Sequence, residues 1–280
     1  MAKYKTVPSA LKMHGAKSYL ATKIVKIAET VKHIHWVEPY FGSGAVTLAK
    51  NPEGISEVAN DLNSCLTDFW NVLQDEKDFL KLQRLLKATP FSEWEFKRAA
   101  KAQASTALVL VGWNRIQAAA DFFIHCRQSL AGRMKDFAPI SRNRVRRGQN
   151  EQVSAWLTAI EGLPEVHARI KRILILNQPA VKVIKSQDGK KTLQYLDAPY
   201  LHETRTDTKA YGEFEMTNEQ HVEMLETVLE CQGKFMISGY DSKLYRKMLK
   251  KWKRHTFSLP NNAASGPVKR RMEESLWTNF

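Results

Sequence analysis

The sequence predicts an α/β protein with a doubly wound sheet and a mainly helical insert. Two short apolar strands flank a glycine turn and a helix in the first quarter of the chain, strand patterns stop after about residue 75, and they resume near residue 160. Strand, glycine turn, helix, strand and acidic residue is the order in which a Rossmann-like sheet begins. We therefore expect a sheet domain over residues 1–75 and 160–280, interrupted by an insert over residues 76–159.

The first elements follow from hydrophobic spacing and turn residues. Apolar residues repeat at helical spacing over Lys17–Val31, and the short run Ile34–Val37 is the first predicted strand. The turn Phe41–Gly44 leads into a helix that ends at Asn51–Gly54, and Ile55–Ala59 is the second strand. The chain then becomes helical, with no clear strand as far as about residue 163.

The second half of the chain alternates between helices and strands again. The predicted elements are the helix 165–170, the strand Ile173–Leu176, the helix Val181–Ile184, the strand Leu193–Leu196, the helix Met216–Cys231 and the strand Lys234–Gly239. Alternation of this kind is typical of a parallel sheet covered by helices.

The charge of the chain indicates a polyanionic partner. Its 280 residues include 43 Lys and Arg against 29 Asp and Glu, a net charge of +14, and the pI is 9.6. Residues 81–150 hold 14 basic and 4 acidic residues, and nine basic residues without an acid lie between Arg246 and Arg271. Because no run of about 18 apolar residues exists, we expect a cytoplasmic nucleic-acid-binding protein with no membrane partner.

The turn after the first strand predicts a site for an adenosyl ligand. Gly42 and Gly44 allow the backbone to approach a ligand, because glycine takes positive φ at little cost. Thr47 stands where a dinucleotide fingerprint has its third glycine, and Asp61 follows 19 residues after Gly42, where a ribose-binding carboxylate is expected. Because the third glycine is missing, we favour an adenosyl ligand without a pyrophosphate. Glu38, at the end of the first strand, is placed to receive the positive amino group of such a ligand.

The strand Leu193–Leu196 ends in Asp197, Ala198, Pro199 and Tyr200. A carboxylate followed by a backbone carbonyl and an aromatic ring can accept both hydrogens of an amino group while the ring stacks on the base that carries it. No second carboxylate or histidine stands at a suitable local spacing for a metal, and the three scattered cysteines contain no Cys-x-x-Cys pair. The segment therefore predicts a site that binds the amino group of a flipped-out nucleobase without a metal.

Taken in order, these motifs resemble the Dam-like, D12-class N6-adenine DNA methyltransferases of the alpha group. The resemblance covers nearly the whole chain, in the segments 8–17 (PSALKMHGAK), 38–48 (EPYFGSGAVTL), 59–63 (ANDLN), 122–132 (FFIHCRQSLAG), 197–200 (DAPY), 238–241 (SGYD) and 274–279 (ESLWTN). Two positions depart from the family pattern. Gly-Ala-Lys at 15–17 replaces Gly-Gly-Lys, and Ala198 replaces the first proline of Asp-Pro-Pro-Tyr.

The resemblance implies methyl transfer from S-adenosyl-L-methionine to the N6 amino group of a flipped-out adenine in double-stranded DNA, at a specific site. It makes the sheet a methyltransferase domain and the insert a target-recognition domain, in a monomeric bacterial or phage-encoded protein. The residues that it assigns to the cofactor are Lys17, Glu38, Pro39, Phe41, Gly42, Gly44 and Asp61. The residues that it assigns to the target base are Asp197, Ala198, Pro199 and Tyr200. The residues expected on DNA are Lys17, Arg127, Arg133, Arg142, Arg144, Arg146 and Arg147.

Three other functions stay open at this point. N4-cytosine methylation is the first, because cytosine also presents an exocyclic amine. A DNA-binding relative with weakened turnover is the second, because Ala198 departs from the catalytic pattern. A pyridine-nucleotide oxidoreductase is the third, and the missing third glycine argues against it.

Overall fold

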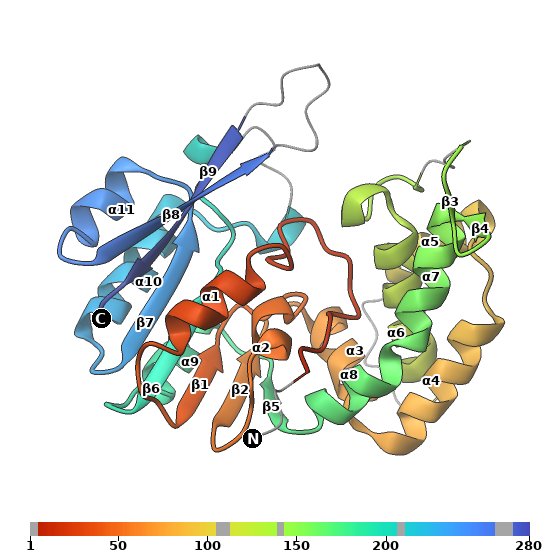
Figure 1. The fold of residues 1–280 in the computed structure, drawn as a ribbon, viewed down its shortest axis with the longest axis horizontal. Helices are drawn as coiled ribbons and strands as arrows, with labels where there is room; N and C mark the ends of the chain where they lie inside the picture. Colours follow the sequence, from red (N-terminus) through yellow and green to blue (C-terminus); the bar gives the residue numbers. More distant parts are fainter. Residues whose placement is uncertain (1–4, 105–112, 139–142, 206–210, 261–270) are drawn as a thin grey trace. The chain divides into compact units, whose positions relative to one another are not determined.

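The computed structural model of the protein describes residues 5–104, 113–138, 143–205, 211–260 and 271–280 (Figure 1). The chain divides into two compact units, each built from segments distant in sequence. The first unit comprises Met1–Lys26, Gly42–Glu53 and Asn63–Asn177, and the second comprises Ile27–Phe41, Gly54–Leu62 and Gln178–Phe280. This geometric division does not test the functional insert expected at residues 76–159, which stays a prediction.

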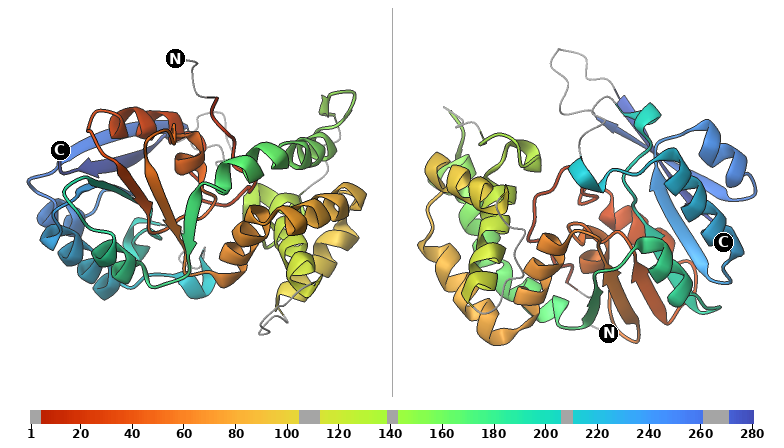
Figure 2. Two further views of the ribbon diagram at one scale, coloured as in Figure 1. Left: turned by 90° about the horizontal axis from the view of Figure 1, so that it is seen from below. Right: turned by 180° about the vertical axis from the view of Figure 1, so that it is seen from behind.

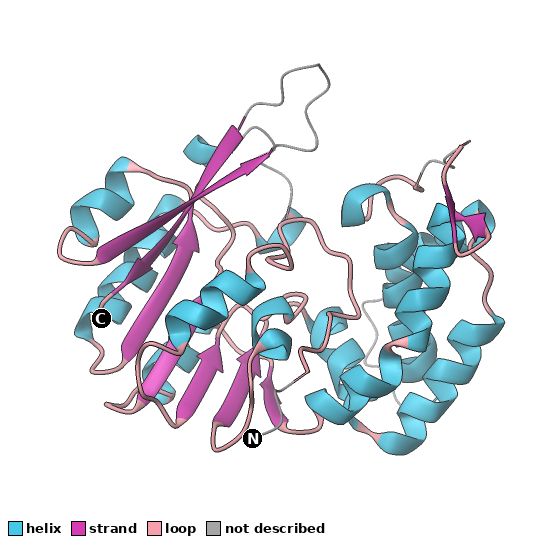
Figure 3. Cartoon of the chain, in the orientation of Figure 1, coloured by secondary structure: helices cyan, strands magenta, loops and turns pink. Residues whose placement is uncertain are grey.

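Helices dominate the first unit (Figure 3). They are α1 (Ala21–Ala28, whose last two residues fall in the second unit), α2 (Ala45–Ala49), α3 (Ser64–Gln74), α4 (Glu76–Ala88), α5 (Glu93–Ala104), α6 (Trp113–Gln128), α7 (Glu151–Glu161) and α8 (Leu163–Ile170), followed by the strand β5 (Ile173–Leu176). Phe69 of α3 stacks on Phe123 of α6 with ring centroids 5.9 Å apart, and Trp156 of α7 contacts Phe123 as well. Large buried aromatic rings of this kind are a main source of core stability.

Side-chain caps set several helix starts in this unit. Asn63, Asp75 and Asn150 each accept a backbone N–H from the first turn of α3, α4 and α7. A short hairpin, β3 (Val145–Arg146) and β4 (Gln149–Asn150), precedes α7. The expectation of no strand between residues 75 and 163 was wrong here, because two-residue strands are too short to show an alternating pattern.

A sheet with helices packed on it forms the second unit. Its strands lie in the order β2 (Ser56–Asn60), β1 (His35–Glu38), β6 (Thr192–Leu196), β7 (Lys234–Gly239), β9 (Arg271–Thr278) and β8 (Lys253–Pro260). The first four are parallel, and β9 runs antiparallel between β7 and β8. The chain passes from β1 to β2 on one side and later returns to β6 on the other side of β1. This switch point confirms the predicted doubly wound α/β fold.

The helices α9 (Ala180–Ser186), α10 (Asn218–Glu230) and α11 (Lys243–Met248) bury one apolar core with the sheet (Figure 2). Ile184, Leu225 and Phe235 are fully buried in it, and each such side chain contributes about 1.5–3 kcal/mol. Ala198 and Leu201 belong to the same cluster. The core therefore holds the segment that follows β6. Among the described residues, no helix is long and apolar enough to cross a membrane.

Candidate active site

The carboxyl edge of the sheet gathers the acidic residues predicted to be functional. All five residues of β6 are buried, and Asp197 follows directly. Glu38 ends the neighbouring strand β1, where it is 3% exposed, and Tyr240 follows β7 on the other side. Because the carboxyl ends of parallel strands meet at one edge, Asp197 lies between Glu38 and Tyr240 along that edge, beside the switch point.

Contacts with Glu274, Asp197 and Tyr240 hold Tyr200. Its hydroxyl donates a short hydrogen bond to Oε1 of Glu274 and lies 3.4 Å from Oδ1 of Asp197. Its ring meets the ring of Tyr240 edge-on, with centroids 4.8 Å apart and an interplanar angle of 76°. The sequence interpretation found Tyr200 but did not assign a role to Glu274, although Glu274 opens the ESLWTN segment.

Ala198 is ordered by packing. It is 3% exposed, and its side chain lies in the apolar core together with Leu196 and Leu201. Packing against these neighbours therefore orders Ala198, the position where the family pattern has proline.

A neutral histidine lies beneath this segment. His221 of α10 is fully buried, and its Nδ1 lies 3.0 Å from the hydroxyl of Tyr245. Burial, and then the charges of Arg205 and His202, lower the pKa of His221 to about 4, while the Pro199 carbonyl acts in the opposite direction. Nε2 of His221 has no hydrogen-bond partner among the described residues.

Tyr245 lies beside His221 and near Asp197. Burial raises the pKa of Tyr245 above its ordinary value, and the nearby Tyr40 and Asp197 raise it further. The phenol therefore stays protonated, and it can donate its hydrogen to Nδ1 of His221.

The chain after Tyr200 is fastened by Glu215. Its carboxylate lies 2.5 Å from Arg205 and 3.2 Å from His202, and it accepts the backbone N–H of Tyr211 at 2.9 Å. Burial acts to raise the pKa of Glu215, but these partners, Arg205 above all, lower it overall. Arg205 also lies over the Tyr211 ring, 5.1 Å from its centroid. These contacts connect residues 202–205 to residues 211–215.

The residues expected around the cofactor in the second unit lie at the ends of β1 and β2. Phe41 donates its backbone N–H to the Asn60 carbonyl at 2.8 Å, and the Asn60 side chain donates to the Pro39 carbonyl at 3.0 Å. Asp61 follows β2 and is half-buried. Glu38, Pro39, Phe41 and Asp61 thus share the edge formed by two adjacent parallel strands.

In the first unit, the glycine turn has the backbone that the sequence predicted. Gly42 and Gly44 have φ angles of +49° and +66°. A Cβ built on Gly42 would meet no atom of the described residues within 4 Å, so the space beside it is open to a ligand. The Gly42 carbonyl accepts a hydrogen bond from the Trp70 indole at 3.2 Å. Lys17 is 4% exposed and donates to the Gly15 carbonyl at 2.9 Å.

A cavity of about 610 Å³ in the first unit carries two cations, Lys12 and Arg127. Lys12 keeps much of its surface in solvent, yet partial burial and then the charge of Arg127 lower its pKa. Burial also lowers the pKa of the half-buried Arg127. Two cations that repel each other in partly desolvated positions favour an anion as the occupant.

The N-terminal segment reaches this cavity by a close backbone approach. The amide of His14 donates to the Gly132 carbonyl at 3.1 Å, and Gly132 has a φ of +70°. A Cβ at Gly132 would lie 2.0 Å from the Lys12 carbonyl oxygen. Glycine is therefore required there on steric grounds as well as for its conformation.

The other arginines predicted to contact DNA differ in their surroundings. Arg133 and Arg146 are exposed. Arg144 lies 3.7 Å from Glu151, and Arg147 donates to Glu161 at 2.9 Å. Arg142 lies outside the described residues.

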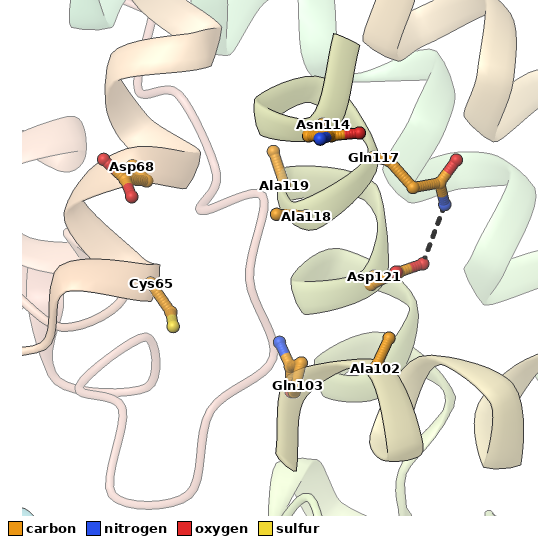
Figure 4. A pocket seen from close by; sticks show the side chains of 9 residues that line it. All are labelled: Cys65, Asp68, Ala102, Gln103, Asn114, Gln117, Ala118, Ala119 and Asp121. Atoms are coloured by element: carbon orange, nitrogen blue, oxygen red, sulfur yellow. Dashed lines mark hydrogen bonds between the residues drawn. The ribbon is translucent and has the colours of Figure 1, made fainter. Parts of the chain in front are cut away.

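A second cavity, of about 200 Å³, lies among α3, α5 and α6 (Figure 4). Asp121 lines it and is already bonded, to Gln117 at 2.9 Å and to Arg98 at 2.8 Å. None of the site residues predicted from the sequence lines this cavity. Among the described residues, no three His, Cys, Asp or Glu side chains gather as metal ligands.

The doubly wound fold, with Asp-Ala-Pro-Tyr at its switch-point edge, defines an α/β enzyme of the methyltransferase class. The chain belongs to the D12 class N6 adenine-specific DNA methyltransferases, whose family model matches residues 14–135 and 141–263. This match confirms the resemblance seen in the sequence, and with it a methyltransferase that modifies adenine in DNA. A search of curated proteins finds no match to the chain.

Proposed function

We propose that the protein transfers a methyl group from S-adenosyl-L-methionine to the N6 amino group of an adenine flipped out of double-stranded DNA, at a short specific site. The observation that carries this proposal is the segment Asp197–Tyr200 at the carboxyl edge of β6, where an ordered carboxylate, main-chain carbonyls and a fixed aromatic ring follow one another. These are the groups that an amino nitrogen on a flat base requires.

The residues at the strand ends fit S-adenosyl-L-methionine. Open space beside Gly42 admits a ligand against the backbone, and Glu38 offers a carboxylate to a positive amino group. Asp61 offers acceptors to ribose hydroxyls. When bound, S-adenosyl-L-methionine supplies an electrophilic methyl group on a sulfonium, so the protein needs neither a metal nor a covalent nucleophile for the transfer.

The chain's own contribution is alignment and charge stabilisation. The Asp197 carboxylate accepts one hydrogen of the amino group and a main-chain carbonyl of the segment accepts the other, which directs the nitrogen lone pair at the methyl group. Positive charge grows on the nitrogen as it attacks, and Asp197 stabilises it; groups of this kind contribute about 3–4 kcal/mol. The released proton passes to water.

DNA binding is supported by charge. The net charge of +14 attracts phosphates. The cavity that holds Lys12 and Arg127 suits an anion, and Arg133 and Arg146 are exposed to solvent.

Mass spectrometry of nucleosides from treated duplex DNA tests the proposal. We expect N6-methyladenine with wild-type protein and none with Asp197→Ala, while DNA binding and thermal unfolding persist. Glu203→Gln, which changes an exposed carboxylate shortly after the segment, is the matched control and should stay active. Product DNA with only N4-methylcytosine would contradict the choice of base. Bound DNA and cofactor without any methylated base would favour a binding protein.

A further inference from the structure

Glu274 is a buried carboxylate close to the catalytic segment. It lies on β9, is 2% exposed, and its Oε1 accepts the hydrogen bond of the Tyr200 hydroxyl. A carboxylate in such a place is costly unless hydrogen bonds compensate for the lost water. Its neighbour Glu273 points the other way, is exposed, and lies 3.0 Å from Arg254. The alternation along the strand thus separates one inward carboxylate from one outward carboxylate.

Sheet register explains how Glu274 reaches the site. Gly239, the last residue of β7, pairs with Ser275 of β9, so Glu274 lies level with Tyr240 just beyond the end of β7. Tyr240 is the residue whose ring meets Tyr200 edge-on. Glu274 of β9 and Tyr240 just beyond β7 therefore hold the hydroxyl and the ring of Tyr200.

The Tyr200 hydroxyl has one hydrogen and two carboxylates within reach. It makes its short bond to Glu274 and is 3.4 Å from Asp197. The bond to Glu274 fixes the position of the Tyr200 hydroxyl, and the edge-on contact with Tyr240 limits the rotation of the Tyr200 ring, which is the surface on which a base would stack.

We propose that Glu274 is a positioning residue that orients Tyr200 for the target base. This inference rests on the proposed function, because it assigns Tyr200 and Asp197 to the base. Because Glu274 acts through Tyr200, changing either residue should slow the same step, the methylation of the bound base. Misplacement of a base-holding group by about 1 Å lowers a rate by about a hundredfold.

A double-mutant cycle of Tyr200→Phe and Glu274→Gln tests the proposal. Each single variant should lower kcat by about ten- to a hundredfold with the KM for S-adenosyl-L-methionine changed by less than about threefold, and the double variant should lose little more than the worse single one. Glu273→Gln, on the same strand, is the control and should keep wild-type kcat. Losses that multiply in the double variant, or a Glu274→Gln enzyme as active as Glu273→Gln, would overturn the proposal.

Urea unfolding of the same four proteins provides a readout that does not need activity. Non-additive changes in unfolding free energy are expected, because the two side chains share one hydrogen bond. If wild-type protein methylates no DNA, the proposed function fails, yet additive unfolding changes would still refute the Tyr200–Glu274 coupling on its own. If Glu274→Gln does not fold, Tyr200→Phe alone decides, and wild-type kcat in that variant would overturn the proposal.

Discussion

His221 should make the folded protein less stable in mild acid. The ring is fully buried, and its pKa is lowered from 6.5 to about 4 by burial and by the charges of Arg205 and His202. The unfolded chain takes up a proton below about pH 6.5, whereas the folded protein keeps the ring neutral down to about pH 4. The unfolding free energy therefore falls as the pH drops through this window, and this contribution is complete above it.

The size of the effect follows from the two pKa values. Between pH 7.5 and 5.5 the unfolded state gains about 1.4 kcal/mol from protonation of this one histidine, and the folded state gains almost nothing. His221→Asn removes the titration while it keeps a polar group near Tyr245. We expect the advantage of the wild-type protein over this variant to shrink by about 1.4 kcal/mol from pH 7.5 to 5.5, as measured by urea unfolding.

The titration of the other groups contributes equally to the unfolding free energies of the wild type and the variant, so it drops out of the difference between them. Nuclear magnetic resonance of the His221 ring, assigned by its loss in the variant, gives the folded-state pKa directly. A ring that titrates near 6.5 in the folded protein, or a stability difference that does not change with pH, would refute the argument that burial keeps His221 neutral.

Four further predictions rest on the packing and the charges. Gly132→Ala should destabilise the protein by about 1–3 kcal/mol or more in thermal unfolding, because the new Cβ would lie 2.0 Å from the Lys12 carbonyl oxygen. Gly162→Ala is the control and should be tolerated, because its Cβ would lie 3.5 Å from the nearest atom, the Thr158 carbonyl oxygen. Ala198→Pro should raise kcat by at most about fivefold, since proline removes an entropy cost on the order of 1 kcal/mol that packing already reduces; a lower kcat would mean that the ring does not fit the core. Arg146→Gln should lower the slope of log affinity for DNA against log salt by about one, if Arg146 contacts phosphate. Glu161→Gln should strengthen DNA binding by releasing Arg147, and unchanged affinity in both variants would indicate a solvated loop.

The elements predicted best from the sequence are those whose signal is local. The strands Ile173–Leu176 and Lys234–Gly239 occur with the predicted bounds, because each contains a short apolar run with polar residues on both sides. The helix expected over Met216–Cys231 spans Asn218–Glu230, with Thr217 as its cap in a capping box with Gln220. Caps and apolar runs depend only on neighbours in the chain.

The strands that the sequence did not predict have no clear hydrophobic pattern of their own. The strand Lys253–Pro260 carries charged and apolar residues without a clear alternation, and its backbone pairs with Arg271–Thr278. The hairpin at Val145–Asn150 turns through Arg147 and Gly148, both at positive φ. A signal this short does not stand out from the surrounding basic loop.

The candidate site divides in the same way. Asp197 and Tyr200 could be proposed from the sequence because an apolar strand precedes them and the motif is contiguous. Glu274 could not be proposed in this way, because its proposed role depends on strand direction. β9 runs antiparallel to β7, so the start of β9, and not its end, lies at the edge that holds Asp197. In a parallel strand at the same place, a residue near the start would lie at the opposite edge, several residues of rise away from Tyr200. Periodicity shows which face a strand buries but not which way it runs, so a buried carboxylate near the start of the last strand gains a function only once its partner strand is known.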